Sequence, residues 1–276
     1  MSAIDSDGKD FALPPNEDPL KNKELKSRKL RNFVTEITDI NRNPTDSSVL
    51  AILSDRPTNP ELLVHQGELL YRARIYTGDK ASTHTGFYGY SPSDSFVPPR
   101  EKATDMRANY RNIPYLYCSN NPYISLCEAR PRLGASVSIA TIIVEQPLTL
   151  FDMTIKQKPP RIDSTKVNLL SDLSTLFSYP VTNEDDTLHY IPTQFIAEYI
   201  KKLDYDGIVY KSAFAEQPDD TPADNIVIFN FKKCRPIRTN IYHIPHLNYT
   251  PERIDKDPRA IQVLSLDTLR LHGSEG

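Results

Sequence analysis

The stretch Thr104–Arg132, TDMRANYRNIPYLYCSNNPYISLCEARPR, places more anion-binding and acidic side chains around one apolar segment than any other window of the chain. The Tyr, Leu and Ile content of IPYLYC predicts a short strand over residues 113–118, which the turn signal SNNP closes. Pro122 suits the first turn of a helix with Asn121 as its N-cap, so Glu128 falls about two turns into that helix. We therefore expect an Arg-rich loop, a strand and a helix that carries one acid.

The side chains of this stretch suit a ligand that contains phosphates and a sugar. The planar fork of arginine matches phosphate oxygens, tyrosine offers a ring face and a hydroxyl, and a carboxylate can bond ribose hydroxyls or face a developing cation. On the window alone, the alternative stays open that Arg107, Arg111 and Glu128 are solvated surface charges.

Regular elements are predicted on both sides of the stretch from hydrophobic periodicity. Helices are predicted over residues 21–43, 47–53 and 165–177 and from Pro192, and strands over residues 68–75, 137–144, 148–153 and 208–210 and from Asn225. The EQP sequence at 145–147 predicts a hairpin turn between two of these strands. Arg72 and Arg74 share one strand face, so they form either a phosphate-binding pair or exposed edge charges.

The bulk composition narrows the class of protein. A chain of 276 residues with a formal charge of −3 can bury a large core and has no basic excess, so non-specific nucleic-acid binding is not suggested. Three cysteines without CxxC spacing indicate neither a disulfide framework nor a zinc site. The N-terminus lacks an apolar signal segment and no run is long enough to span a bilayer. We expect a cytoplasmic protein that does not contact the membrane.

Several familiar catalytic motifs are missing from the sequence: GxSxG, GxGxxG, GxxxxGK[ST] and HExxH. His243 and His246 lack a second ligand pair, and the acidic run 184–186 is better explained as a solvated loop, so no metal is expected. Cys118 and Cys127 are interpreted as structural thiols. By position alone, Ser212 is a turn serine as readily as a binding hydroxyl.

Taken together, six blocks resemble the RES domain family in order and spacing. They are LYRAR at 70–74, MRANYRNIPYLYCSNNPYISLCEARP at 106–131, LTLFDMT at 148–154, TQFIAEYI at 193–200, YDGIVYKS at 205–212 and NIVIFN at 225–230. The resemblance implies an α+β fold like that of ADP-ribosyltransferases, with central β-sheets flanked by helices, and NAD as substrate. It divides the chain into an N-terminal extension, residues 1–65, with at least one helix, and a RES domain, residues 66–276.

The resemblance also assigns site residues. It carries the family's Arg, Glu and Ser onto Arg72, Glu128 and Ser212, which we expect to be catalytic. It also assigns residues that bind NAD. These are Arg72 and Ser212 again, together with Arg107, Asn109, Tyr117 and Asn225. Met106 stands where the family usually has Gly, and we expect this to alter the backbone path of the phosphate-side loop.

The resulting hypothesis is an NAD-consuming enzyme that cleaves the nicotinamide glycosidic bond, either a glycohydrolase or a phosphorylase. The resemblance implies a bacterial toxin of a toxin–antitoxin pair, with an Xre-type antitoxin as partner. The alternatives are an ADP-ribosyltransferase that modifies a protein or nucleic acid, a non-catalytic nucleotide-binding module, and a nucleic-acid-directed factor that uses the basic segment 21–31.

Overall fold

The computed structural model describes residues 25–44, 47–78, 82–156, 162–179, 187–214 and 223–247, and the backbone of two short antiparallel strands, β1 (Ala3–Ile4) and β2 (Asp10–Phe11). The chain divides into two compact units, Met1–Pro245 and His246–Gly276. The sheet and all the helices of the described residues lie in the first unit.

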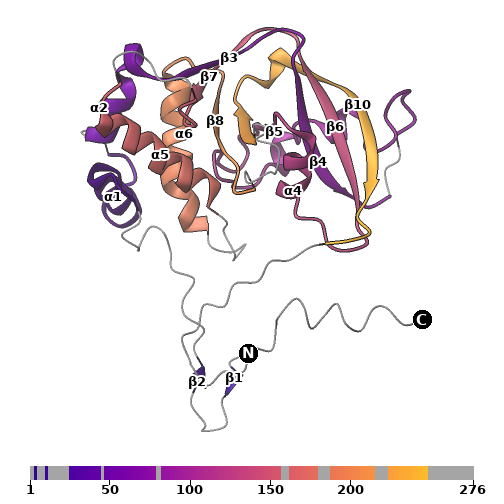
Figure 1. The fold of residues 1–276 in the computed structure, drawn as a ribbon, viewed down its shortest axis with the longest axis horizontal. Helices are drawn as coiled ribbons and strands as arrows, with labels where there is room; N and C mark the ends of the chain where they lie inside the picture. The colour runs from indigo at the N-terminus through magenta and orange to yellow at the C-terminus, as the bar shows by residue number, and fades with distance from the viewer. Residues whose placement is uncertain are drawn as a thin grey trace. The chain divides into compact units, whose positions relative to one another are not determined.

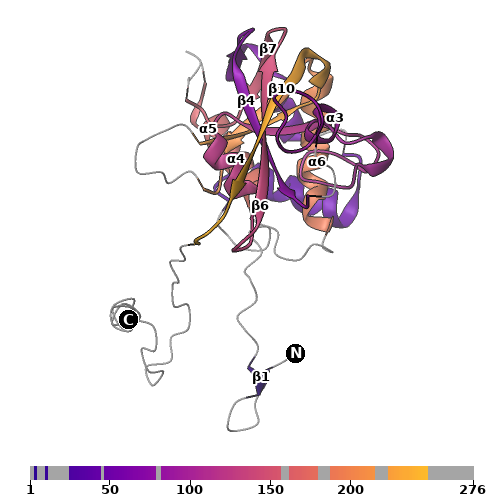
Figure 2. The ribbon, with the colours of Figure 1, turned by 90° about the vertical axis from the view of Figure 1, so that its right-hand side faces the viewer.

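One eight-stranded mixed sheet forms the centre of this unit. Its strands, in spatial order, are β10 (Cys234–His243), β6 (Ser136–Val144), β4 (Leu69–Tyr76), β5 (Leu116–Ser119), β9 (Asp224–Ile228), β8 (Gly207–Lys211), β7 (Leu148–Asp152) and β3 (Glu61–Val64). Neighbouring strands are antiparallel except β7 and β8. Figure 2 shows β10 lying along β6.

The sheet is weakly joined at its middle, between β4 and β5. On its other side, β4 pairs with β6 along its whole length, from Leu69 to Tyr76. With β5 it shares one pair only, Tyr71 opposite Ser119. Two sheet halves that meet at a single pair diverge beyond it, because no further ladder hydrogen bonds hold them together. The stretch Thr104–Arg132 lies at this division, because it contains β5.

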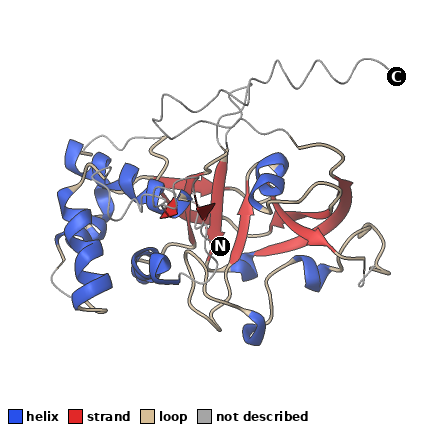
Figure 3. Ribbon diagram, turned by 90° about the horizontal axis from the view of Figure 1, so that it is seen from below, coloured by secondary structure: helices blue, strands red, loops and turns tan. Residues whose placement is uncertain are grey.

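Helices cover the half of the sheet formed by β7, β8 and β9. The helical segments of the described residues are α1 (Arg28–Thr35), the π-helix η1 (Glu36–Ile40), α2 (Ser48–Ser54), α3 (Pro92–Ser95), α4 (Pro122–Glu128), α5 (Ser164–Ser178), α6 (Ile191–Lys202), and the short 3₁₀ turns η2 (Arg56–Thr58), η3 (Arg100–Lys102), η4 (Thr187–Tyr190) and η5 (Phe231–Lys233). Figures 1 and 3 show α1, α2, α5 and α6 gathered at one end of the sheet, with α4 separate from them beside β4.

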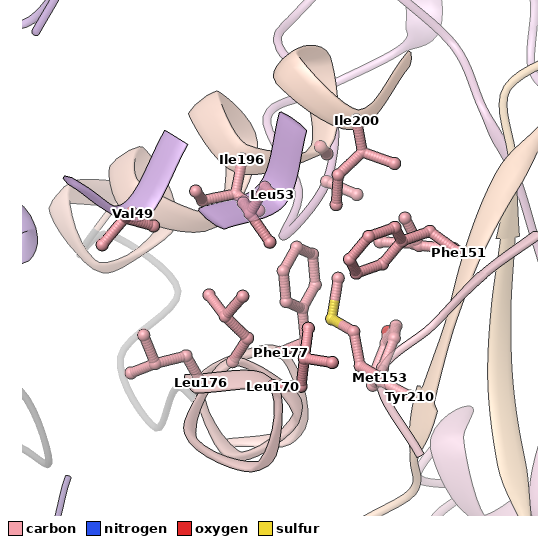
Figure 4. Close-up of a cluster of buried hydrophobic side chains, with 14 of the residues drawn as sticks. Val49, Leu53, Phe151, Met153, Leu170, Leu176, Phe177, Ile196, Ile200 and Tyr210 are labelled. Carbon is pink, nitrogen blue, oxygen red and sulfur yellow. The ribbon is translucent and has the colours of Figure 1, made fainter. Parts of the chain in front are cut away.

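The larger core lies between these helices and the sheet. Phe151 and Met153 project from the end of β7 toward Phe177 of α5 and Ile196 of α6, and all four are almost completely buried (Figure 4). Each large apolar side chain buried in this way contributes about 1.5–3 kcal/mol to folding. Tyr210 of β8 closes the cluster on the sheet side, with its ring 5.3 Å from that of Phe177. The core therefore reaches from the helical layer to the centre of the sheet.

Helix caps explain most of the helix starts. Ser27, Ser47 and Asp163 accept backbone N–H groups at the beginnings of α1, α2 and α5 through their side chains. The predicted helix over residues 21–43 has its α-helical part only from Arg28, because Ser27 caps it there, and it ends in a π-helix. Residues 21–24 of that prediction lie outside the described residues.

The predicted hairpin between the strands 137–144 and 148–153 is wrong. Strand β6 has β4 and β10 on its two sides, so neither of its edges is free for β7, which pairs with β3 and β8 instead. The connecting residues Glu145 and Gln146 donate their N–H groups to the carbonyl of Lys233 at η5. They form a corner between the two sheet halves rather than a turn within one.

The α+β class with a sheet flanked by helices is confirmed. The predicted elements over 47–53, 68–75, 165–177 and 208–210 each appear with bounds shifted by one residue at either end or less. The strand predicted over 113–118 runs over Leu116–Ser119 instead. The short edge strand β3 was not predicted. The acidic run 184–186 lies outside the described residues.

Candidate active site

A cleft of about 450 Å³ opens where β4 and β5 diverge. Its lining comes from the strands β4, β5, β8 and β9, from α4 and η4 and from the loops before β5 and after α4. It includes Arg72, Arg107, Tyr117, Glu128, Tyr210 and Asn225. Residues far apart in the chain meet here because the sheet order places β4, β5, β9 and β8 next to one another. The cleft combines three arginines, a carboxylate, an amide and aromatic rings.

Glu128, the last residue of α4, is held in the cleft by two hydrogen bonds to one carboxylate oxygen. Ser212, just after β8, donates its hydroxyl to Glu128 Oε1 at 2.7 Å, and Asn225 of β9 donates its amide Nδ2 to the same oxygen at 2.6 Å. Both donors are buried, and Ser212 Oγ also accepts the N–H of Phe214, which fixes its direction. Among the described residues, Oε2 of Glu128 receives no hydrogen bond, so it is available to a ligand.

The helix that carries Glu128 begins as predicted. Asn121 accepts the N–H groups of Tyr123 and Ile124 through its side-chain oxygen, and Pro122 occupies the first turn. Seven residues then bring Glu128 to the end of the helix. The short helix therefore sets the distance between the turn after β5 and the carboxylate.

Arg72 bridges the division in the sheet. Its Nη1 donates to the carbonyl of Tyr117 at 3.2 Å, a group that has no ladder partner on β4 because the strands have separated there. Its Nε is buried and has no hydrogen-bond partner among the described residues. Burial, with a smaller contribution from repulsion by Arg74, lowers the pKa of Arg72 to about 10. An anion in the cleft would stabilise this poorly compensated cation.

Arg74 does not join Arg72 in the cleft. Its guanidinium donates to the carbonyl of Asp94 and lies over the ring of Tyr90, 5.7 Å from its centroid. It therefore anchors the segment around α3, and the predicted alternatives of a phosphate-binding pair or an exposed edge charge both fail for this residue.

Arg107 lies on a tight turn that packs against Tyr117. The Tyr117 hydroxyl accepts the N–H of Ala108 at 3.0 Å and donates to Asn109 Oδ1 at 2.8 Å. The guanidinium of Arg107 donates to the carbonyl of Phe177 near the end of α5. Asn109 is 2 % exposed and its amide donates to two backbone carbonyls, so it orders the turn and does not line the cleft.

Comparison with known families decides the assignment. The family model described as the RES domain matches residues 69–252, well over half of the chain. The chain belongs to the RES domain family. Among solved structures, one chain of the M. tuberculosis MbcT–MbcA toxin–antitoxin complex matches with 13 % identity and a TM-score of 0.39, covering 71 % of this chain and 92 % of that one. A TM-score below 0.5 is too low to carry a structural argument. Comparison with curated proteins finds no match.

Within this RES domain, the residues predicted for the site converge on the cleft. Arg72, Arg107, Tyr117, Glu128 and Asn225 line it. The remaining two, Ser212 and Asn109, act on lining residues through hydrogen bonds. Their contacts with a ligand stay predictions, as does the domain boundary at residue 66. Helices α1 and α2, which precede that boundary, pack in the same core as the RES domain.

The RES domain cleft also contains residues that sequence reasoning missed. They are Tyr71, Tyr190 and Tyr210, which widen the aromatic lining, and Arg130. Arg130 is exposed but lies at the cleft with a positive φ of 46°. Tyr210 lies in the YDGIVYKS block, two residues before Ser212. Because residues two apart on a strand point to the same face, the prediction for Ser212 could have indicated Tyr210 as well.

Met106 fits the turn in place of the glycine usual in the family. Of the described non-glycine residues, only Asn112, Arg130, Ile155 and Asp204 have positive φ, so the backbone at Met106 suits any residue. Its side chain is 43 % exposed and lines the cleft. The substitution therefore adds apolar surface to the cleft, and the structure gives no sign of a glycine-requiring conformation there.

Tyr117, Tyr210 and Cys118, which line the cleft, are in their neutral forms at neutral pH. Burial raises the pKa of Tyr117 and of Tyr210, and it also raises the pKa of the Cys118 thiol. None of these groups is suited to act as a base or thiolate nucleophile at neutral pH. Among the described residues, no group of three or more His, Cys, Asp or Glu side chains could hold a metal, and no helix could cross a membrane.

Proposed function

We propose that this RES domain protein is an NAD-consuming enzyme that cleaves the nicotinamide N-glycosidic bond. The observation that carries the proposal is the carboxylate of Glu128, oriented through Oε1 by Ser212 and Asn225, in a cleft that also presents Arg72 and Arg107. Carboxylates that face a developing sugar cation are the common element of glycosidic bond cleavage.

The chemistry needs no general acid. When the bond between the ribose C1′ and the pyridinium nitrogen breaks, its electron pair stays on nitrogen, so nicotinamide leaves as a neutral molecule. The positive charge moves to an oxocarbenium-like ribose. The open Oε2 of Glu128 would face this charge and bond a ribose hydroxyl. Charge fixed where charge develops is usually the largest catalytic contribution of a site.

The arginines supply the binding energy for the rest of the substrate. Arg72 and Arg107 would hold the diphosphate of NAD, because a guanidinium fork matches phosphate oxygens. The hydroxyl of Tyr117 is used within the protein, so this residue would act through its ring face toward the nicotinamide ribose. Ser212 and Asn225 are positioning residues for Glu128.

The acceptor that captures the ribose decides the reaction class. Water would lose a proton and give ADP-ribose, whereas inorganic phosphate would give ADP-ribose 1″-phosphate. The purified protein should be incubated with NAD with and without phosphate, and nicotinamide and the sugar product should be quantified. Glu128→Gln tests the site, with Glu101→Gln, an exposed glutamate outside the cleft, as matched control. If the wild type releases no nicotinamide under either condition, the enzyme proposal fails.

A toxin role follows from the same activity, since loss of NAD stops growth. We propose an antitoxin partner that covers the Arg-lined cleft, supported by membership in the RES domain family. Induced expression should arrest growth for the wild type and not for Glu128→Gln. Neighbouring reading frames should include a small helix-turn-helix protein, and the absence of growth arrest would contradict the toxin role.

A further inference from the structure

Gln194 is a buried amide that reaches from α6 to the turn bearing Arg107. It lies in the first turn of the helix, two residues after Pro192, and is 3 % exposed. Its Nε2 donates to the carbonyl of Met106 at 3.0 Å and to the carbonyl of Asn109 at 2.9 Å. One nitrogen therefore ties both ends of the turn to the helical layer.

Other hydrogen bonds order the turn through residues of its own loop and of β5, whereas Gln194 connects it to α6. The N–H of Met106 donates to the carbonyl of Asn109 at 3.0 Å, which closes the loop of four residues with Arg107 and Ala108 at its tip. The tip itself is held by the hydroxyl of Tyr117 through the N–H of Ala108. The carbonyl of Asn109 keeps the N–H of Met106 as a donor, so loss of the Gln194 amide would remove the donor of the Met106 carbonyl in particular. A buried carbonyl left unpaired costs about 1–3 kcal/mol.

The chemistry of this contact requires a primary amide. A single –NH₂ group offers two hydrogens and can satisfy two carbonyls, whereas glutamate has no donor in its ionised form and methionine has none at all. Glutamine is also long enough to span from the helix backbone to the turn. Nε2 of Gln194 also lies 3.4 Å from Oδ1 of Asp105, the residue before the turn, so all three of its acceptors belong to this loop.

We propose that Gln194 is a positioning residue that sets the affinity of the cleft for the anionic part of its ligand by fixing Arg107. The guanidinium of Arg107 is bound to the carbonyl of Phe177 at the end of α5, while its backbone is held by α6. Two helices thus determine where this cation stands. The identity of the ligand as NAD rests on the proposed function, but the structural part of the inference does not.

The first experiment measures the turn itself by amide hydrogen exchange. In Gln194→Met, the peptide that covers residues 103–112 should exchange about tenfold faster or more, because opening of the turn no longer breaks two hydrogen bonds. Gln146→Met, which alters an exposed glutamine, is the control and should leave this peptide unchanged. Unchanged exchange in Gln194→Met would overturn the proposal. If that variant does not fold, Gln194→Asn, which draws the amide back by one methylene, replaces it with the same expected result.

The second experiment is a double-mutant cycle between Gln194→Met and Arg107→Ala. We expect Gln194→Met to raise the KM for NAD about tenfold with a smaller change in kcat, and to have no further effect when Arg107 is already alanine. Equal effects in both backgrounds would show that Gln194 acts on stability alone and would contradict the proposal. If the wild type does not turn NAD over, the proposed function fails while the exchange experiment still decides the role of Gln194.

Discussion

Replacing Glu128 by glutamine isolates the charge of the candidate catalytic group from its position. The amide oxygen of glutamine can accept the same hydrogen bonds that Ser212 and Asn225 now donate to Oε1, at 2.7 and 2.6 Å. The side chain should therefore keep its orientation, while the group facing the ligand changes from a charged oxygen to an amide nitrogen. Folding should change little, because both donors retain an acceptor.

The expected loss of rate depends on how far solvent screens the lost charge. A unit charge at about 4 Å from a cationic ribose contributes about 4 kcal/mol at an effective dielectric of about 20, and about 1 kcal/mol in bulk water. Since about 1.4 kcal/mol is tenfold in rate, the two limits are roughly a thousandfold and roughly fivefold. The sheet and α4 enclose the carboxylate of Glu128 in part, so we expect a loss close to the upper limit.

The assay is nicotinamide release at saturating NAD, with the melting temperature and the NAD dissociation constant measured in parallel. We expect kcat to fall by at least about a hundredfold, the melting temperature to stay within a few degrees, and NAD binding to persist through Arg72 and Arg107. A fall in kcat of less than about fivefold, with binding intact, would refute the role of Glu128 as the stabilising charge.

Other regions of the molecule give further tests. Because burial lowers the pKa of Arg72 to about 10 and the cation is the form that binds a diphosphate, the affinity for NAD should weaken as pH rises through 10. Calorimetry should show this slope in the wild type and not in Arg72→Gln. Gly207→Ala should lower the free energy of unfolding by about 3 kcal/mol, measured by urea denaturation, because a Cβ there would lie 2.3 Å from the carbonyl oxygen of Val227. In the native protein a thiol reagent should modify the half-buried Cys127 well before the buried Cys118, as mass spectrometry would report, and the reverse order would contradict the packing.

Local signals predicted the helix that carries the candidate catalytic acid. Asn121 and Pro122 are sequence-adjacent and act within one helical turn, so their role as cap and first-turn residue needs no knowledge of the rest of the fold. The strand of Arg72 was also predicted from its own residues, and its bounds differ from the prediction by one residue at each end. What these signals left open was which elements stand beside one another.

Strand order was the part that local reasoning could not supply. The apolar run before Glu145 and the run after Pro147 look like the two arms of a hairpin, and a proline-containing turn joins them. The sequence of a strand does not specify which other strands pair with its two edges. In this sheet β4 and β10 pair with the two edges of β6, so β7 cannot pair with it. Long-range pairing therefore overrode a locally reasonable turn.

The division between β4 and β5 explains why the candidate site was harder to predict than its separate residues. A strand normally satisfies its neighbour's carbonyls through the ladder, but beyond Tyr71 and Ser119 that ladder stops, and the carbonyl of Tyr117 is satisfied by Arg72 instead. The same guanidinium that stabilises the opening lies at the cleft and keeps Nε unpaired. Since a buried cation without full compensation lowers stability, a ligand phosphate that pairs with it would stabilise the open sheet as well as bind. In this RES domain, one side chain therefore both bridges the opening of the sheet and presents an unpaired donor, which is why we expect the two to respond together to a bound anion.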